Sequence, residues 1–265
     1  MRDYPEARGL GKKASTSYLM IMVLVLVGSF LLLIRSPPFY SPVERTRPLK
    51  VALIDEVAVT NPDPYLVSNV TRTLAKVGYT LDYYGPSEIT VDFFKTLPSL
   101  GYGIIILRDH STALSGDAIA LVTAESFDPG KHVEEQLAGA LVQAHIGSID
   151  TNYFAFTPTF VRESMQGTFS NTLLVVMGCA GLANSEMAQA FVARGAQVYV
   201  SWNQIVLTNQ SDGGTILLLE SLTTGHTVDE AVTWATERSP PSLYYATQMG
   251  YYPLDQGETV LKLGA

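Results

Sequence analysis

A single cysteine and one of four histidines lie where strands of a parallel sheet are expected to end. Cys179 follows the apolar run 173–177 by two residues, and His110 follows the run 104–107 by three. Catalytic groups of open parallel sheets lie beyond the carboxyl ends of the strands, so the two side chains should meet at one edge. A thiol beside an imidazole can lose its proton and attack a carbonyl carbon. The pair is a candidate nucleophile and base; a small buried thiol and a surface histidine are the alternative.

The residues that flank Cys179 suit the same chemistry. Gly178 allows a tight turn before the cysteine, and Gly181 allows close approach of the backbone after it. Backbone N–H groups at such a turn can stabilise the oxyanion that forms during acyl transfer.

The remaining histidines point to weaker alternatives. His132 and His145 lie thirteen residues apart, which is not a metal-ligand spacing, so we expect no metal site. His226 comes after the candidate nucleophile, as the histidine does in an α/β-hydrolase. That fold requires glycine two residues before and two after the nucleophile; Gly181 meets the second requirement, but Met177 fails the first.

The composition excludes several classes of protein. The chain has 265 residues, of which 16% are charged and 47% hydrophobic, and this favours a folded domain over a disordered one. Its net charge is -8 and it has no dense basic run, so we expect no nucleic-acid partner. One cysteine cannot form an intramolecular disulfide, a CxxC pair or a multi-cysteine zinc site.

Short apolar runs alternate with amphipathic stretches from residue 50 onward. We expect strands at 51–54, 80–84, 103–107, 173–177 and 197–202, and helices at 64–77, 91–97, 133–144, 185–194, 212–219 and from 228. The stretch 153–156 reads as either a strand or a packed loop. Asp63 before Pro64 and the capping box Thr227–Glu230 mark two helix starts. This alternation predicts an α/β fold with a mostly parallel sheet and helices on both faces.

The N-terminal segment predicts one transmembrane helix before that domain. Residues 14–34 carry no charge and, at about 1.5 Å per residue, are long enough for a bilayer's hydrocarbon core. A cleaved signal peptide is the alternative. The chain then divides into a polar tail (1–13), the anchor (14–34), a proline-rich stalk (35–49) and the α/β domain (50–265).

The side of the membrane is indicated by the charges at the anchor. Four Lys or Arg residues lie on each flank, but Lys12 and Lys13 abut the apolar segment and favour an extracytoplasmic domain. The sequons at Asn69 and Asn209 are compatible with export.

Five segments carry a family pattern. They are a strand ending near histidine (102–110), a strand ending in Gly-Cys (171–181), a helix ending in Gly-Ala (187–196), a strand ending in Ser-Trp (198–202) and a Gly-His-Thr-Val-Asp-Glu-Ala helix start (225–231). Over about residues 50 to 240 the chain resembles CHAT-type domains of the caspase-like superfamily, to which clan CD cysteine peptidases belong.

The resemblance implies roles for four residues. Cys179 becomes the nucleophile and His110 the general base and acid. The family has glycine directly after the histidine, where it gives a backbone N–H to the oxyanion hole; here Ser111 holds that position and still offers an N–H. Gly178 and the N–H of Cys179 would form the other side of the hole.

The resemblance also implies a pocket for the substrate residue before the cleaved bond. Its expected lining is Asp55, Glu56, Met177, Ser201 and Trp202. An acidic pocket would favour a basic substrate residue by charge pairing. Two solvated strand-end carboxylates are the alternative.

The sequence therefore predicts a membrane-anchored cysteine endopeptidase with a Cys–His dyad, acting on a peptide or protein and needing no cofactor. The alternative from another class is a catalytically silent caspase-like module, tethered to the membrane for binding or scaffolding. Neither prediction specifies an oligomeric state.

Overall fold

The computed structural model describes residues 50–115, 118–147, 150–239 and 246–261, all within the unit Thr46–Ala265. The predicted tail, anchor and stalk (1–49) lie outside the described residues. Within the described ranges, no helix is long and apolar enough to cross a membrane.

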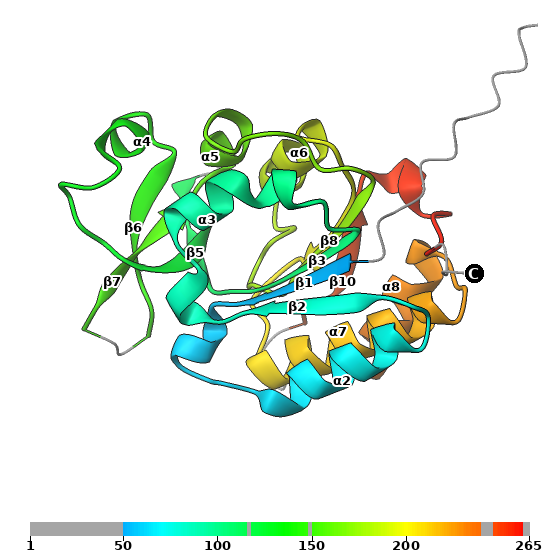
Figure 1. Ribbon diagram of the computed structural model, residues 1–265. Helices are drawn as coiled ribbons and strands as arrows, with labels where there is room; N and C mark the ends of the chain where they lie inside the picture. The colour runs from blue at the N-terminus through cyan, green and yellow to red at the C-terminus, as the bar shows by residue number, and fades with distance from the viewer. Residues whose placement is uncertain (1–49, 116–117, 148–149, 240–245, 262–265) are drawn as a thin grey trace, which may run out of the picture. The chain divides into compact units, whose positions relative to one another are not determined.

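A six-stranded sheet forms the centre of the fold (Figure 1). Its order is β10-β9-β8-β3-β1-β2, and every neighbouring pair is parallel except β10 with β9. The strands are β1 (Lys50–Asp55), β2 (Thr80–Tyr84), β3 (Ile104–Arg108), β8 (Thr172–Val176), β9 (Ala196–Trp202) and β10 (Met249–Tyr252). Every residue of β3 and β8 is buried, as expected of strands covered on both faces.

Helices cover both faces of this sheet, which confirms the predicted α/β class (Figure 1). One face packs against α2 (Pro64–Ala75), α7 (Thr208–Thr223) and α8 (Val228–Arg238). The other packs against α3 (Val91–Thr96), α5 (Pro158–Glu163) and α6 (Glu186–Ala193). Successive strand residues serve opposite faces, so Ile104 belongs to the first core and Ile105 to the second. Short 3-10 turns at Val57–Val59, Pro86–Glu88, Leu97–Leu100 and Leu254–Gln256 complete the connections.

The two expected helix starts are confirmed. The Asp63 carboxylate accepts hydrogen bonds from the N–H groups of Tyr65 and Leu66 at the start of α2. Thr227 and Glu230 form both bonds of the capping box that opens α8.

A second, antiparallel sheet was not expected from the sequence. Its order is β4-β5-β7-β6, with β4 at Ser111–Ala113, β5 at Ile119–Ser126, β6 at Leu141–His145 and β7 at Asn152–Phe156. The stretch 153–156 is therefore a strand.

The helix predicted at 133–144 is wrong beyond its first turn. The helix α4 covers only Val133–Leu137, a turn follows at 138–140, and β6 begins at Leu141. Gly139 has φ +67°, a left-handed conformation that ends a helix and that glycine adopts without strain. The helical spacing of apolar residues continued across this break by coincidence.

The central sheet brings three strand ends together. β3 lies between β1 and β8, and all three are parallel, so their carboxyl ends meet at one edge. Leu107 is in register with Val176, and His110 and Cys179 each follow three residues later. Asp55 is in register with Arg108, so Glu56 follows at the same edge.

Candidate active site

Cys179 and His110 line the same pocket, which has a volume of about 90 Å³. Other parts of its wall are Asp109 and Gly178 beside the dyad, and Val206 from the segment that leads into α7. The structure thus brings the two predicted reactive residues together at the end of adjacent strands.

The imidazole of His110 is held by Glu56. The Nδ1 atom of His110 lies 2.8 Å from Glu56 Oε2, and the backbone N–H of His110 donates to the same oxygen at 2.7 Å. The Glu56 side chain is fully buried, whereas the imidazole is about one third exposed. A carboxylate can only accept, so Nδ1 carries the hydrogen and Nε2 is left as the basic nitrogen of the neutral ring.

The thiol of Cys179 is half-buried and donates to the backbone carbonyl of Val206 at 3.5 Å. No hydrogen bond joins the thiol to His110 in the described part of the chain. The sulfur must leave Val206 before it can pass its proton to the imidazole. Catalytic hydrogen bonds are often absent before a substrate is bound.

The turn at the cysteine presents free backbone donors. Within the described ranges, the N–H groups of Gly178 and Cys179 have no hydrogen-bond partner, as an oxyanion-binding nest requires. The Cys179 carbonyl accepts a hydrogen bond from the Ser111 hydroxyl at 2.5 Å, which fixes the turn. Ser111 opens β4 in an extended conformation, so its position does not need glycine.

Gly178 lies in close contact with the end of β3. A Cβ atom there would lie 3.0 Å from the backbone oxygen of Asp109 and 3.1 Å from its Oδ1. The glycine therefore lets the cysteine turn lie directly on the end of β3.

A buried ion cluster forms the wall behind the pocket. The Arg108 guanidinium donates to Asp212 through Nε and Nη2 at 2.8 and 2.9 Å, and to Asp55 through Nη1 at 2.8 Å. It links β1 and β3 to α7. Burial raises the pKa of the Asp212 carboxyl, and the hydrogen bonds from Arg108 oppose that rise.

Four of the five predicted substrate-pocket residues are already occupied by other contacts. Asp55 pairs with Arg108, and Glu56 with His110. The Ser201 hydroxyl donates to the carbonyl of Val176 at 2.7 Å, and the Trp202 indole donates to Ser211 at 3.2 Å. Of the five, Met177 is the one that lines the pocket. Because Asp55 and Glu56 are buried, the alternative of solvated strand-end carboxylates is wrong.

Asp109 is a site residue that the sequence did not indicate. It is only 4% exposed, and neither carboxyl oxygen has a hydrogen-bond partner in the described ranges. Burial raises the pKa of the Asp109 carboxyl well above its usual value, and the nearby charge of Glu56 raises it further. The only sequence signal was its place between a buried strand and a candidate catalytic histidine.

The remaining histidines lie outside this pocket. His226 follows the far end of α7, a 16-residue helix about 24 Å long whose Thr208 lines the pocket. Its ring bonds locally to Ser221 and Thr224. That separation argues against the hydrolase alternative. Among the described residues, no three His, Cys, Asp or Glu side chains are grouped to hold a metal ion.

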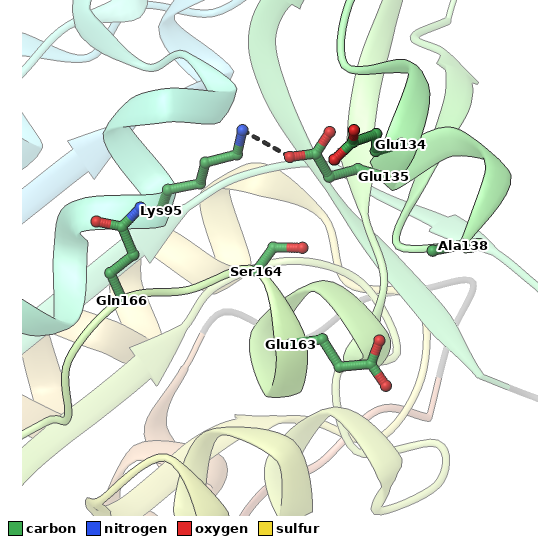
Figure 2. A pocket seen from close by; sticks show the side chains of 7 residues that line it. All are labelled: Lys95, Glu134, Glu135, Ala138, Glu163, Ser164 and Gln166. Carbon is green, nitrogen blue, oxygen red and sulfur yellow. Dashed lines mark ion pairs between the residues drawn. The ribbon is translucent and has the colours of Figure 1, made fainter.

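A larger pocket of about 310 Å³ lies among α3, α4 and α5 (Figure 2). Glu134, Glu135 and Glu163 contribute to its lining, and the Lys95 ammonium pairs with Glu135 at 2.7 Å. The hydrogen bond from Lys95 lowers the pKa of the Glu135 carboxyl. Its lining contains no thiol or imidazole.

No protein-family model matches the chain, and no curated protein matches it in sequence. The functional conclusion therefore depends on the strand-end pocket and on the resemblance of the five segments.

Proposed function

We propose that the chain is a cysteine endopeptidase of the caspase-like, CHAT-like type, with Cys179 as nucleophile and His110 as general base and acid. One observation carries the proposal: the imidazole is anchored by a buried carboxylate in the pocket that also contains the thiol. In nucleophile–base sites the base is characteristically oriented by a third group of this kind.

The topology supports the family part of the proposal. His110 follows β3 and Cys179 follows β8, two adjacent parallel strands, with the histidine first in the chain. This is the order that the resemblance to caspase-like domains implies. Open parallel sheets place ligands at this edge.

The proposed reaction is peptide hydrolysis in two steps. The Cys179 thiol passes its proton to His110 Nε2, and the sulfur attacks the substrate carbonyl carbon. The N–H groups of Gly178, Cys179 and Ser111 stabilise the oxyanion. The imidazolium gives its proton to the leaving amine, the C–N bond breaks and a thioester remains. His110 then takes a proton from water, whose oxygen displaces the sulfur and releases the acid.

A catalytically silent module is the second candidate, and the resting thiol favours it. The thiol hydrogen bonds to Val206 and not to His110. The pocket volume of about 90 Å³ is well below the roughly 300–1,000 Å³ of typical ligand pockets.

Peptide cleavage separates the two candidates. The full chain, Cys179→Ala and His110→Ala are incubated with a proteome-derived peptide library, and new termini are identified by mass spectrometry. The peptidase proposal expects cleavage by the unmodified chain alone. Cleavage that survives in either variant overturns the dyad, and no cleavage by any chain favours the silent module.

We also propose that residues 14–34 anchor the protein in a membrane, with the catalytic domain on the extracytoplasmic side. The uncharged length of the segment and the Lys12–Lys13 pair support this. The full chain should stay with membranes through an alkaline carbonate wash, and added protease should digest the domain in intact cells. Release by the wash would overturn the anchor, and protection of the domain would reverse the orientation.

A further inference from the structure

Glu56 is a fully buried carboxylate that, among the described residues, accepts hydrogen bonds from His110 alone. Oε2 accepts from the backbone N–H of His110 at 2.7 Å and from its ring at 2.8 Å. Oε1 is buried and has no hydrogen-bond partner among the described residues. Contacts to both the main chain and the ring leave the imidazole little freedom to turn away from the pocket.

The buried charge also favours a positive ring. An ionised carboxylate in the interior is costly unless it is paired, and the ring in contact with Glu56 is that of His110, which becomes a cation when protonated. When Cys179 passes its proton to Nε2, positive charge therefore develops next to a carboxylate that needs it. The carboxylate of Glu56 is thus placed to stabilise an imidazolium at His110 once the proton has been transferred.

The neighbouring charged groups, Arg108 and Asp109, do not replace Glu56 as the partner of the His110 ring. The Arg108 guanidinium is bound by Asp55 and Asp212. Asp109, which follows in the chain, lies close to Glu56 but accepts no hydrogen bond from another described residue. Of the two neighbouring carboxyls, Glu56 is the one that accepts hydrogen bonds from His110, whereas burial raises the pKa of the Asp109 carboxyl.

We propose that Glu56 is a positioning residue that completes a Cys179–His110–Glu56 triad, fixing the tautomer of the imidazole and stabilising its protonated form. The proposal rests on the proposed peptidase function and adds a third member to the dyad. It also reassigns Glu56, which the sequence had placed in the substrate pocket.

The chain offers a matched control in a second carboxylate–histidine pair. His132 Nε2 lies 3.1 Å from Glu125 Oε1, in the part of the chain that carries the antiparallel sheet. Neither residue lines the Cys179 pocket. Glu125→Gln therefore removes the same chemical group from a similar pair without touching the proposed triad.

The test is the alkylation rate of Cys179 by iodoacetamide in the full chain, at pH 6 and at pH 10. At pH 6 a free thiol with a pKa of about 8.5 is almost wholly protonated, so fast alkylation requires the imidazolium. We expect Glu56→Gln and His110→Ala each to react about tenfold or more slowly than the unmodified chain at pH 6. At pH 10 thiolate forms without assistance, so the rates should converge to within about twofold.

Two control variants distinguish an effect of the Glu56 charge from other effects of the substitution. Glu125→Gln should match the unmodified chain at both pH values. Glu56→Asp keeps the charge with a shorter reach and should retain more of the pH 6 rate than Glu56→Gln. This second variant also keeps the test informative if the glutamine variant does not fold.

Three results would overturn the triad. If Glu56→Gln reacts at the unmodified rate at pH 6 while His110→Ala is slow, the dyad stands without Glu56. If Glu56→Gln is slow by the same factor at both pH values, its role is structural. If Glu56→Asp is alkylated more slowly at pH 6 than Glu56→Gln, the charge of Glu56 is not the cause of fast alkylation of Cys179. A fast His110→Ala variant at pH 6 instead removes the proposed peptidase dyad itself.

Discussion

Replacing Asp109 by Asn changes the ionisation of the pocket with little change in its shape. The two side chains are nearly isosteric, and Asp109 is buried with neither oxygen hydrogen-bonded to another described residue. Because burial raises the pKa of this carboxyl, the folded chain keeps the proton where the unfolded chain has lost it. We expect Asp109→Asn to stabilise the fold, by an amount that depends on pH.

The direction and the size of this stability difference follow from the number of protons bound in the folded and unfolded states. Below pH about 4 the carboxyl is protonated in both states, and its burial as a neutral acid carries no pH-dependent cost. As the pH rises toward the folded pKa, the unmodified chain loses about 1.4 kcal/mol of stability per pH unit, since its unfolded state binds one proton fewer. Asparagine does not titrate, so the variant has no such pH-dependent loss of stability. The advantage of Asp109→Asn should therefore widen by up to about 2.7 kcal/mol between pH 4.5 and 6.5.

Urea unfolding at several pH values, followed by tryptophan fluorescence, measures this difference. Trp202 is 1% exposed and Trp234 is 43% exposed, so the emission should shift when the core opens. Asp255→Asn is the matched control, because Asp255 is exposed and should show no such widening. A difference between Asp109→Asn and the unmodified chain that stays constant from pH 4.5 to 6.5 would mean that Asp109 is ionised in the fold. The assignment of the proton to Asp109 would then be wrong.

Two further substitutions test the surroundings of the pocket. Gly178→Ala puts a Cβ atom about 3 Å from two oxygens of Asp109, and we expect a loss of about 1–3 kcal/mol in the free energy of unfolding by urea; an unchanged value would show that the turn has room. Arg108→Met leaves Asp55 and Asp212 buried without their cation, so the same assay should show a loss of about 3–5 kcal/mol. A loss under about 1 kcal/mol would mean that water reaches both carboxylates.

The central sheet was predictable because its strands are short, continuous apolar runs that bury both faces. The edge strand β10 carried no such signal, since Gly250, Tyr251 and Tyr252 are only half-buried. The break at Gly139 and the pairing of β6 with β7 also escaped sequence analysis. Pairing is a contact between distant residues, and the apolar spacing of 133–144 fits a helix equally well.

The candidate site was likewise predictable only in part. The residue types and their places after apolar runs were enough to select Cys179 and His110. The partners of the buried charged side chains could not be predicted in this way. Asp212 had been expected to open a helix, whereas α7 begins at Thr208 and carries the Asp212 carboxylate to Arg108. Nothing in the local sequence of α7 indicates a guanidinium from a strand more than a hundred residues earlier.

The register of the strands links the predicted pair, Cys179 and His110, to the buried charges that were not predicted. Leu107 pairs with Val176, and counting three residues onward from each reaches the imidazole and the thiol. Counting one residue onward from the pair of Asp55 with Arg108 places Glu56 level with Asp109, beside the histidine. A shift of one residue in either pairing would exchange the faces to which side chains point and separate the carboxylate from the ring. The buried pair of Asp55 with Arg108 opposes such a shift between β1 and β3, because moving either residue leaves a charge without its partner. The ion cluster behind the pocket therefore favours the β1–β3 alignment that places Glu56 beside His110.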